Sequence, residues 1–303
     1  MSRVNTARRR VRAGTIIRKN RVVSERKLSF RLPIGEIVAN ETLLVRKNGY
    51  VCTLVLNCPE KRNVLTAGLF VEFSQRMREL SKDDAIRTIV IRGAGDEAFC
   101  SGYDISALTD DPAPEIRGIG QNPFTTFEMV LESIINYPYP VIAMLNGYAF
   151  GGGCELAVSC DIRIGADHIR MGMTPAKIGM VYPPEGLLRF IQTIGLSKTK
   201  EIFFTGRAYD ARRAKEMGLI DYLVPKAELE SFTYKLAEEI TGNAPLSLKG
   251  IKRMLNLVLH RDQMAAGDRQ EAEEILARTF KSHDLKEGRA AFLEKRKPAF
   301  RGR

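Results

Sequence analysis

The sequence has little histidine, and its three histidines, His168, His260 and His283, lie far apart. Zinc sites usually take histidine and cysteine ligands at short, regular spacings, so this sequence predicts no metal site. The five cysteines are scattered as well and form no C-x-x-C pair. An odd number of dispersed cysteines is typical of a reduced, intracellular protein and excludes a framework of disulfides.

Long hydrophobic runs are also absent. A membrane-spanning helix needs about 20 mainly apolar residues, whereas the longest apolar stretches here, such as Val141–Leu145, have the length of a strand. We therefore expect no membrane contact and no secretory signal. Apolar residues still make up 44% of the 303 residues and charged residues 27%. This composition supports a substantial core and excludes a wholly disordered chain.

Positive charge is concentrated at the start of the chain. Residues 1–31 contain eleven Lys or Arg and a single acid, Glu25, whereas the whole chain has a net charge of +11. Almost all the excess charge therefore lies in this segment, and the rest is nearly neutral. We expect residues 1–38 to form a flexible extension. The predicted location is cytoplasmic, with the mitochondrial matrix as the alternative if the Arg-rich start is a transit peptide.

Strand and helix patterns alternate along the chain after the extension. Two β-rich segments surround Asn48-Gly49, a dipeptide that favours a hairpin turn. Short apolar strands are expected at residues 88–91, 140–145 and 161–165. Apolar side chains at helical spacing predict helices at residues 66–80, 127–135, 187–194, 199–204, 229–240, 246–259, 269–279 and 283–297. Strands joined by crossover helices predict an α/β fold with mainly parallel pairing.

Two glycine-rich turns follow predicted strands and are the best candidates for a site. Ala98–Asp104 comes after the strand at 88–91, and Asn146–Glu155, with three consecutive glycines, after the strand at 140–145. Such turns let another molecule approach the backbone, and a starting helix leaves N–H groups unpaired. Together they could direct two donors at an oxyanion. The alternative is a close-packed turn in which Glu155 only complements the helix dipole.

Four motifs, in order along the chain, resemble the crotonase (enoyl-CoA hydratase/isomerase) superfamily: Leu56–Leu65, Ala98–Asp104, Asn146–Glu155 and Phe292–Pro298. The resemblance implies a spiral of ββα turns with a helical C-terminal trimerisation region. The catalytic core that binds acyl-CoA would span residues 39–225, and the helical region residues 226–303. It also implies a homotrimer or a dimer of trimers that needs no cofactor, because coenzyme A is part of the substrate.

The resemblance also implies roles for individual residues. The backbone N–H groups of Tyr103 and Gly152 would form an oxyanion hole for a thioester enolate, with Glu155 and Tyr182 as further catalytic residues. The residues implied to contact the substrate or CoA are Arg62, Val64, Ser101, Asp104, Phe292 and Lys295. The last two belong to the final helix and would commonly contact the CoA of a neighbouring subunit.

One departure from the hydratase pattern bears on the reaction. Hydratases of the superfamily use two glutamates, and twenty residues after Glu155 this sequence has Pro175, with no Asp or Glu at residues 168–184. The stretch Met173–Tyr182 instead resembles methylmalonyl-CoA decarboxylase, another member of the superfamily, whose tyrosine corresponds to Tyr182. Loss of CO₂ forms an enolate without removing a proton, so a missing base favours decarboxylation.

The sequence therefore predicts a lyase that decarboxylates a 2-carboxyacyl-CoA such as methylmalonyl-CoA, with Tyr182 orienting the leaving carboxylate. One alternative is an enoyl-CoA hydratase or isomerase that uses Glu155 alone. Another is a homologue that binds RNA through its Arg-rich extension. The nearly neutral body and the lack of interleaved aromatic residues in the extension argue against RNA as the main partner.

Overall fold

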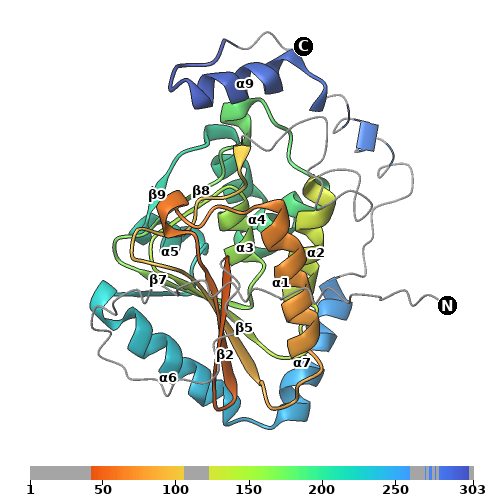
Figure 1. The fold of residues 1–303 in the computed structure, drawn as a ribbon, viewed down its shortest axis with the longest axis vertical. Helices are drawn as coiled ribbons and strands as arrows, with labels where there is room; N and C mark the ends of the chain where they lie inside the picture. The colour runs from red at the N-terminus through yellow and green to blue at the C-terminus, as the bar shows by residue number, and fades with distance from the viewer. Residues whose placement is uncertain are drawn as a thin grey trace, which may run out of the picture. The chain divides into compact units, whose positions relative to one another are not determined.

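The structure is a computed structural model that describes residues 42–105, 123–259 and 280–299, together with positions 270, 273, 274 and 277 (Figure 1). These residues belong to one structural unit, Ile34–Arg303. The basic extension at 1–38 and most of the helix predicted at 269–279 lie outside the described residues.

Two sheets form the centre of the fold. The larger has the strand order β1-β2-β3-β5-β7-β10, and the smaller the order β4-β6-β8-β9. The strands of the larger sheet are β1 (Leu43–Asn48), β2 (Val51–Leu56), β3 (Thr88–Gly93), β5 (Val141–Leu145), β7 (Ile162–Ala166) and β10 (Tyr222–Val224). Those of the smaller sheet are β4 (Ala98–Cys100), β6 (Tyr148–Phe150), β8 (Arg170–Gly172) and β9 (Tyr209–Asp210). Among the described strands, β1–β2 and β8–β9 pair antiparallel and the other neighbours pair parallel, which confirms the predicted α/β class.

The helices are α1 (Ala67–Leu80), α2 (Pro123–Ile135), α3 (Gly152–Val158), α4 (Pro184–Thr205), α5 (Ala211–Met217), α6 (Leu229–Thr241), α7 (Pro245–Leu259) and α9 (His283–Leu293), with 3₁₀ turns η1 (Pro59–Lys61), η4 (Pro175–Ile178) and η5 (Lys226–Glu228). The first four helices each follow two strands: α1 follows two strands of the larger sheet, and α2, α3 and α4 follow one strand from each sheet. The chain thus repeats strand, strand and helix, as the spiral of ββα turns predicts. In Figure 1, α1 and α2 lie side by side against the larger sheet.

Local sequence explains the elements that were predicted. The Asn48-Gly49 turn joins β1 and β2 in register Asn48↔Val51, and Gly49 has the positive φ of 56° that such turns require. Helix α1 begins after Thr66, whose side chain accepts a hydrogen bond from the N–H of Leu69 at 3.3 Å. All six residues of β2 are buried, as expected for a strand covered on both faces.

Two predictions from the sequence differ from the structure. Residues 98–100 and 148–150, taken as parts of turns, form strands β4 and β6, because three residues are too few to display a periodic pattern. The last helix ends at Leu293 instead of residue 297. Lys295 has a positive φ of 55°, and the Arg296 N–H donates back to the Ala291 carbonyl at 2.9 Å. This C-terminal capping stops the helix.

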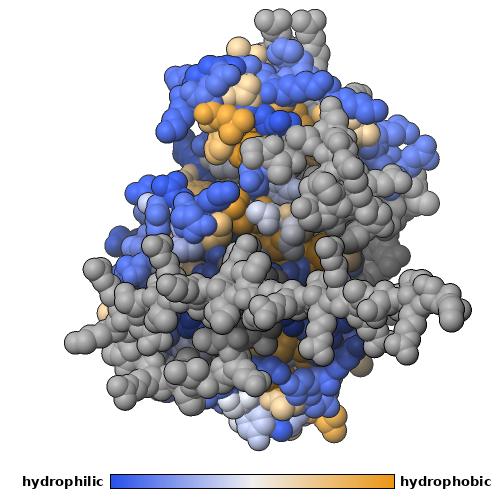
Figure 2. All heavy atoms as spheres, in the orientation of Figure 1, coloured by the Kyte–Doolittle hydropathy of each residue, from blue (hydrophilic) through white to orange (hydrophobic). Residues whose placement is uncertain are grey.

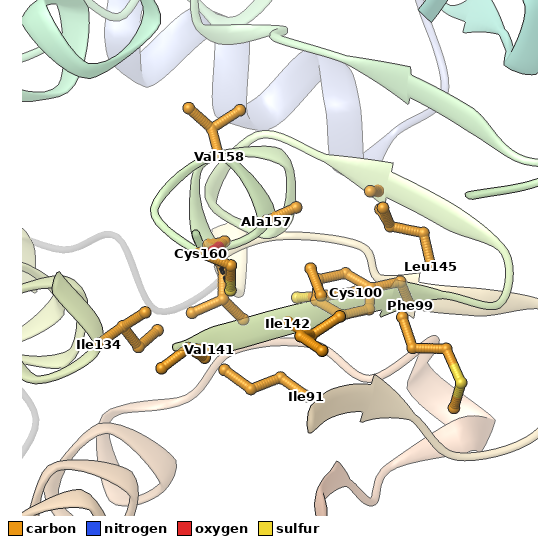
Figure 3. Close-up of a cluster of buried hydrophobic side chains, with 14 of the residues drawn as sticks. Ile91, Phe99, Cys100, Ile134, Val141, Ile142, Leu145, Ala157, Val158 and Cys160 are labelled. Atoms are coloured by element: carbon orange, nitrogen blue, oxygen red, sulfur yellow. Dashed lines mark hydrogen bonds between the residues drawn. The ribbon is translucent and has the colours of Figure 1, made fainter. Parts of the chain in front are cut away.

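The hydrophobic core packs helices α1, α2 and α3 against the larger sheet, and Phe70, Phe73 and Met77 of α1 are among its largest buried side chains. Figure 3 shows Ile91, Val141 and Ile142 of the central strands beneath Ala157 and Cys160 at the end of α3. These side chains are fully buried or nearly so. All five cysteines are free thiols. No helix in the described ranges is long and apolar enough to span a membrane.

Two buried asparagines tie the turns at the ends of the central strands together. The Asn146 side chain accepts from the Gly93 N–H at 3.0 Å and donates to the Gly95 carbonyl at 2.7 Å. The Asn63 amide donates to the carbonyls of Ala94 and Ala98 at 3.0 and 2.8 Å. Because backbone groups in these turns have buried polar partners, the turns keep one arrangement.

Helix α7 is anchored to the core by a buried cation. Lys252 is 7% exposed, and its ammonium donates to the carboxylate of Asp161 at 2.6 Å and to the carbonyls of Ile134 and Tyr139, both at 3.1 Å. These three bonds satisfy all three donors of the ammonium group.

We predict that Lys252→Met destabilises the protein by about 1–3 kcal/mol, the usual cost of leaving a buried acceptor without its donor, because Asp161 is 34% exposed and can be hydrated. The matched control is Lys249→Met on the same helix. Its ammonium pairs with Asp84 at 2.5 Å, where both side chains are more exposed, so the expected loss is about 1 kcal/mol or less. Urea denaturation measures both variants. Equal losses for the two variants would contradict the anchoring role of Lys252.

Candidate active site

The two glycine-rich turns meet in the structure. Strands β4 and β6 pair in parallel, so the turns that follow them lie at the same edge of the smaller sheet. A Cβ on Gly102 would lie 2.7 Å from the Phe150 carbonyl oxygen and 3.2 Å from the Gly152 nitrogen. The backbone of the first turn therefore touches the first residue of α3, an approach that only glycine permits.

Two backbone N–H groups remain available at this contact. The Leu65 N–H donates to the Gly102 carbonyl at 2.8 Å, and the Asp104 N–H donates to the Leu65 carbonyl at 3.1 Å. This pattern leaves the N–H of Tyr103, between them, directed away from Leu65. The N–H of Gly152 starts α3 and has no intrahelical acceptor. Neither N–H has an acceptor among the residues that the structure describes.

Apolar side chains surround the two N–H groups. Atoms of Leu65 and Phe127 lie 3.2 and 3.4 Å from the point where a Cβ of Gly152 would stand. The Phe70 ring lies with its centroid 5.5 Å from that of Tyr103 and 5.2 Å from that of Phe127. A low-dielectric wall of this kind strengthens a hydrogen bond to a developing oxyanion.

Glu155 lies one helical turn beyond Gly152 on α3 and is 3% exposed. One carboxylate oxygen accepts a hydrogen bond from the Tyr182 hydroxyl, and the other accepts from the Arg189 guanidinium at 2.9 Å. A Cβ on Gly186 would come within 2.7 Å of the Glu155 carboxylate and 2.5 Å of the Tyr182 ring. The missing side chain at Gly186 thus lets α4 approach both residues.

Burial raises the pKa of Glu155 above its usual range, while the cation of Arg189 and the hydrogen bond from Tyr182 act in the opposite direction. The pKa of Tyr182 is raised well above that of a free tyrosine, first by burial and then by the charge of Glu155. Tyr182 therefore stays protonated at neutral pH. Its single hydroxyl proton is donated to Glu155.

The sequence analysis missed Arg189 and its second partner, Glu128. The Arg189 guanidinium also donates to the Glu128 carboxylate on α2. Burial raises the pKa of Glu128, with a smaller opposing effect of Arg189. One signal was present, since Arg189 is the single Lys or Arg at residues 178–197 and follows an apolar pair. A lone cation in an apolar helix indicates a buried partner.

A cavity of about 880 Å³ lies beside this network, between α2, the end of α3 and α4. Glu128 and Arg189 line it, together with Glu132, Glu185 and Ser159. Tyr103, Gly152 and Glu155 do not line it. The cavity therefore reaches the outer side of the Arg189 guanidinium and not the two N–H groups.

The other predicted site residues fall into two places. One group lies along the first turn and consists of Arg62, Val64, Ser101 and Asp104. Val64 precedes Leu65, which forms a β-bridge with Tyr103. The Ser101 N–H donates to the Arg62 carbonyl at 3.0 Å. Phe292 and Lys295 lie instead at the end of α9, which packs on η4: a Cβ on Gly288 would come within 2.1 Å of the Ile178 carbonyl oxygen.

Metal or thiol chemistry has no support in the described part of the chain. No group of three or more His, Cys, Asp or Glu side chains there could hold a metal ion. Burial raises the thiol pKa of Cys100 and of Cys154 to about 12, so both thiols remain protonated and weakly nucleophilic.

Comparison with known proteins agrees with the motifs. The sequence profile of the enoyl-CoA hydratase/isomerase family matches residues 46–303. The short-chain-enoyl-CoA hydratase of Clostridium acetobutylicum is 30% identical over 258 residues, which cover 84% of this chain and 95% of the relative.

Solved structures give the same result. A methylmalonyl-CoA decarboxylase in complex with 2-nitronate-propionyl-CoA superposes with a TM-score of 0.80 at 28% identity, covering 88% of this chain and 100% of the other. The enoyl-CoA hydratase of Bacillus anthracis superposes with a TM-score of 0.66 at 28% identity, covering 86% and 100%. This chain therefore belongs to the enoyl-CoA hydratase/isomerase family of acyl-CoA enzymes, the crotonase superfamily indicated by its motifs.

Proposed function

We propose that this protein decarboxylates a 2-carboxyacyl-CoA thioester of the methylmalonyl-CoA type. The observation that carries the proposal is that both carboxylate oxygens of Glu155 are engaged, by Tyr182 and by Arg189. The segment η4, where a hydratase of the superfamily has its second glutamate, contains no acid. Among the residues that the structure describes, the two N–H groups could stabilise an oxyanion, whereas the Glu155 carboxylate is already engaged and so is less available as a base.

The chemistry of decarboxylation fits such a site. The bond between C2 and the carboxylate breaks, CO₂ leaves, and the electron pair moves into the thioester to form an enolate. The N–H groups of Tyr103 and Gly152 would bind the enolate oxygen, and each donor of this kind contributes about 2.7–4 kcal/mol to the barrier reduction. C2 then takes up a proton; we propose that the Tyr182 hydroxyl donates it and that water reprotonates the tyrosinate afterwards.

Arg189 also reduces the electrostatic repulsion between Glu155 and the substrate carboxylate. A bare Glu155 anion would repel the carboxylate of the substrate. The guanidinium at 2.9 Å offsets that charge. We propose that Tyr182 transfers its hydrogen bond from Glu155 to the substrate carboxylate, while Glu155 keeps its bond to Arg189. The higher TM-score of the methylmalonyl-CoA decarboxylase, 0.80 against 0.66 for the hydratase, supports the same reading.

Hydration or isomerisation of an enoyl-CoA is the second candidate function. It is favoured by the 30% identity to a short-chain-enoyl-CoA hydratase. In that case Glu155 alone would have to serve as acid and base, after giving up at least one of its two partners.

We further propose that the protein is a homotrimer or a dimer of trimers, in which Phe292 and Lys295 contact the CoA of a neighbouring copy. Phe292 is 57% exposed, and hydrophobic surface is visible beside α9 in Figure 2. Helix α7 also presents Ile251, Met254 and Leu255 to solvent, which supports an interface there. Within one copy, we propose that CoA contacts Arg62, Val64, Ser101 and Asp104. We also propose a cytoplasmic location. Any binding of RNA would occur through the basic extension.

Replacing the donor at Gly152 tests the oxyanion hole. We predict that Gly152→Pro, which removes the N–H at a helix position that tolerates proline, lowers turnover by at least about 10²-fold. Gly152→Ala keeps the N–H, and its Cβ would meet side-chain atoms and no backbone, the nearest at 3.2 Å, so it should lose much less. Steady-state kinetics and CoA affinity separate the effects. Wild-type turnover by a folded Gly152→Pro variant would place the hole elsewhere.

A panel of thioesters tests the choice of reaction. We expect methylmalonyl-CoA to release CO₂ and crotonyl-CoA to be hydrated slowly or not at all, with products identified by mass spectrometry. Tyr182→Phe should slow CO₂ release about tenfold or more, since a hydrogen bond to a charged group contributes roughly 1.5–3 kcal/mol. Fast hydration that Glu155→Gln abolishes and Tyr182→Phe leaves unchanged would favour the hydratase instead.

A charge placed on α7 tests the oligomer. We predict that Met254→Asp lowers the molar mass measured by light scattering, because a buried unpaired carboxylate disfavours an apolar interface. Arg253→Asp introduces a carboxylate at an exposed position on another side of the same helix and should leave the mass unchanged. An unchanged mass for Met254→Asp would exclude this face as the interface.

A further inference from the structure

Arg189 connects three helices through two carboxylates. Its guanidinium donates from Nη1 to Glu155 on α3 at 2.9 Å and from Nη2 to Glu128 on α2. The Arg189 side chain is 12% exposed and that of Glu155 is 4% exposed, whereas that of Glu128 is 31% exposed. A planar guanidinium holds its donors in a rigid fork, so its two bonds fix the direction of both carboxylates.

The placement of Arg189 on α4 is specific. It follows Gly186 by three residues and therefore lies on the same face of the helix. The absence of a side chain at Gly186 brings that face against the Glu155 carboxylate, which would be 2.7 Å from a Cβ there. Arg189 also lies between Glu155 and the cavity, since Arg189 lines the cavity and Glu155 does not.

We infer that Arg189 is a positioning residue, which holds the Glu155 carboxylate against Tyr182 and withholds it from acting as a base on water. Glu128 is the competing partner and limits how strongly Arg189 binds Glu155. The kinetic consequence of this arrangement rests on the proposed function, but the arrangement itself can be measured without any substrate.

The charged groups around the network define the direction of each effect. Tyr182 from the segment before α4, Arg189 of α4 and Glu128 of α2 face Glu155, and Glu132 and Glu185 act on Glu128. Removing the cation leaves the buried Glu155 carboxylate close to that of Glu128 with no cation between them, which raises the pKa of Glu155. Removing the charge of Glu128 takes away a repulsion and leaves Arg189 to Glu155 alone, which lowers the same pKa.

The experiment is a carbon-13 NMR titration of the full-length protein labelled at glutamate carboxyl carbons, with Glu155→Gln to assign the resonance. We expect Arg189→Met to raise the pKa of Glu155 by about 1–3 units and Glu128→Gln to lower it by up to about one unit. Arg189→Lys keeps the charge but loses the paired donors of the guanidinium, so it should raise the pKa of Glu155 by less than Arg189→Met does. Arg189→Met and Glu128→Gln both break the ion pair between Arg189 and Glu128. A general structural disturbance would therefore shift the pKa of Glu155 in the same direction in both variants, and not in opposite directions.

Shifts of the same sign in Arg189→Met and Glu128→Gln, or no shift in either, would overturn the inference. If Arg189→Met does not fold, Glu128→Gln decides alone, because it alters the more exposed partner. The pH dependence of CO₂ release from methylmalonyl-CoA is measured in parallel. Opposite pKa shifts without CO₂ release would support the positioning role and refute the proposed reaction, whereas CO₂ release with an unshifted Glu155 would refute the positioning role alone.

Discussion

The close contact between two backbone segments is the constraint on which the candidate site depends. A Cβ on Gly153 would stand 2.2 Å from the Cys100 carbonyl oxygen, and one on Gly102 would stand 2.7 Å from that of Phe150. No side chain fits between β4 and the start of α3, so these positions require glycine. The same contact brings the N–H groups of Tyr103 and Gly152 together, and it places Glu155 one helical turn away, beside α4.

The parts of this arrangement that follow from local sequence could be predicted. The strands β3, β5 and β7 and helix α1 lie within a residue or two of their predicted bounds, because their apolar residues recur at strand or helix spacing. The two glycine turns could be recognised for a different reason, because glycine indicates a tight turn or a close approach to the backbone. The family and the α/β class followed from these motifs and are confirmed.

The ion pairs that complete the fold and the site could not be predicted. Arg189 lies 34 residues from Glu155 and 61 from Glu128 along the chain, and Lys252 lies 91 residues from Asp161. Each pair depends on how helices pack in space, and no local pattern encodes that packing. In α7 the buried side contains a lysine while Met254 and Leu255 are exposed, so helical periodicity alone assigns its faces incorrectly.

The charges of Glu155, Glu128 and Arg189 favour the proposed decarboxylation over hydration. Glu155 and Glu128 share one cation, Arg189, and a substrate carboxylate placed beside Tyr182 would be a further anion in a largely buried site. Burying such an anion is costly. Decarboxylation removes it as neutral CO₂ and moves the electron pair to the thioester oxygen, beside two N–H donors. The site would therefore bind the charge distribution of the transition state better than that of the substrate, which is the condition for catalysis. Hydration would also place charge on the thioester oxygen, but it requires a base that removes a proton from water, and both oxygens of Glu155 are already engaged.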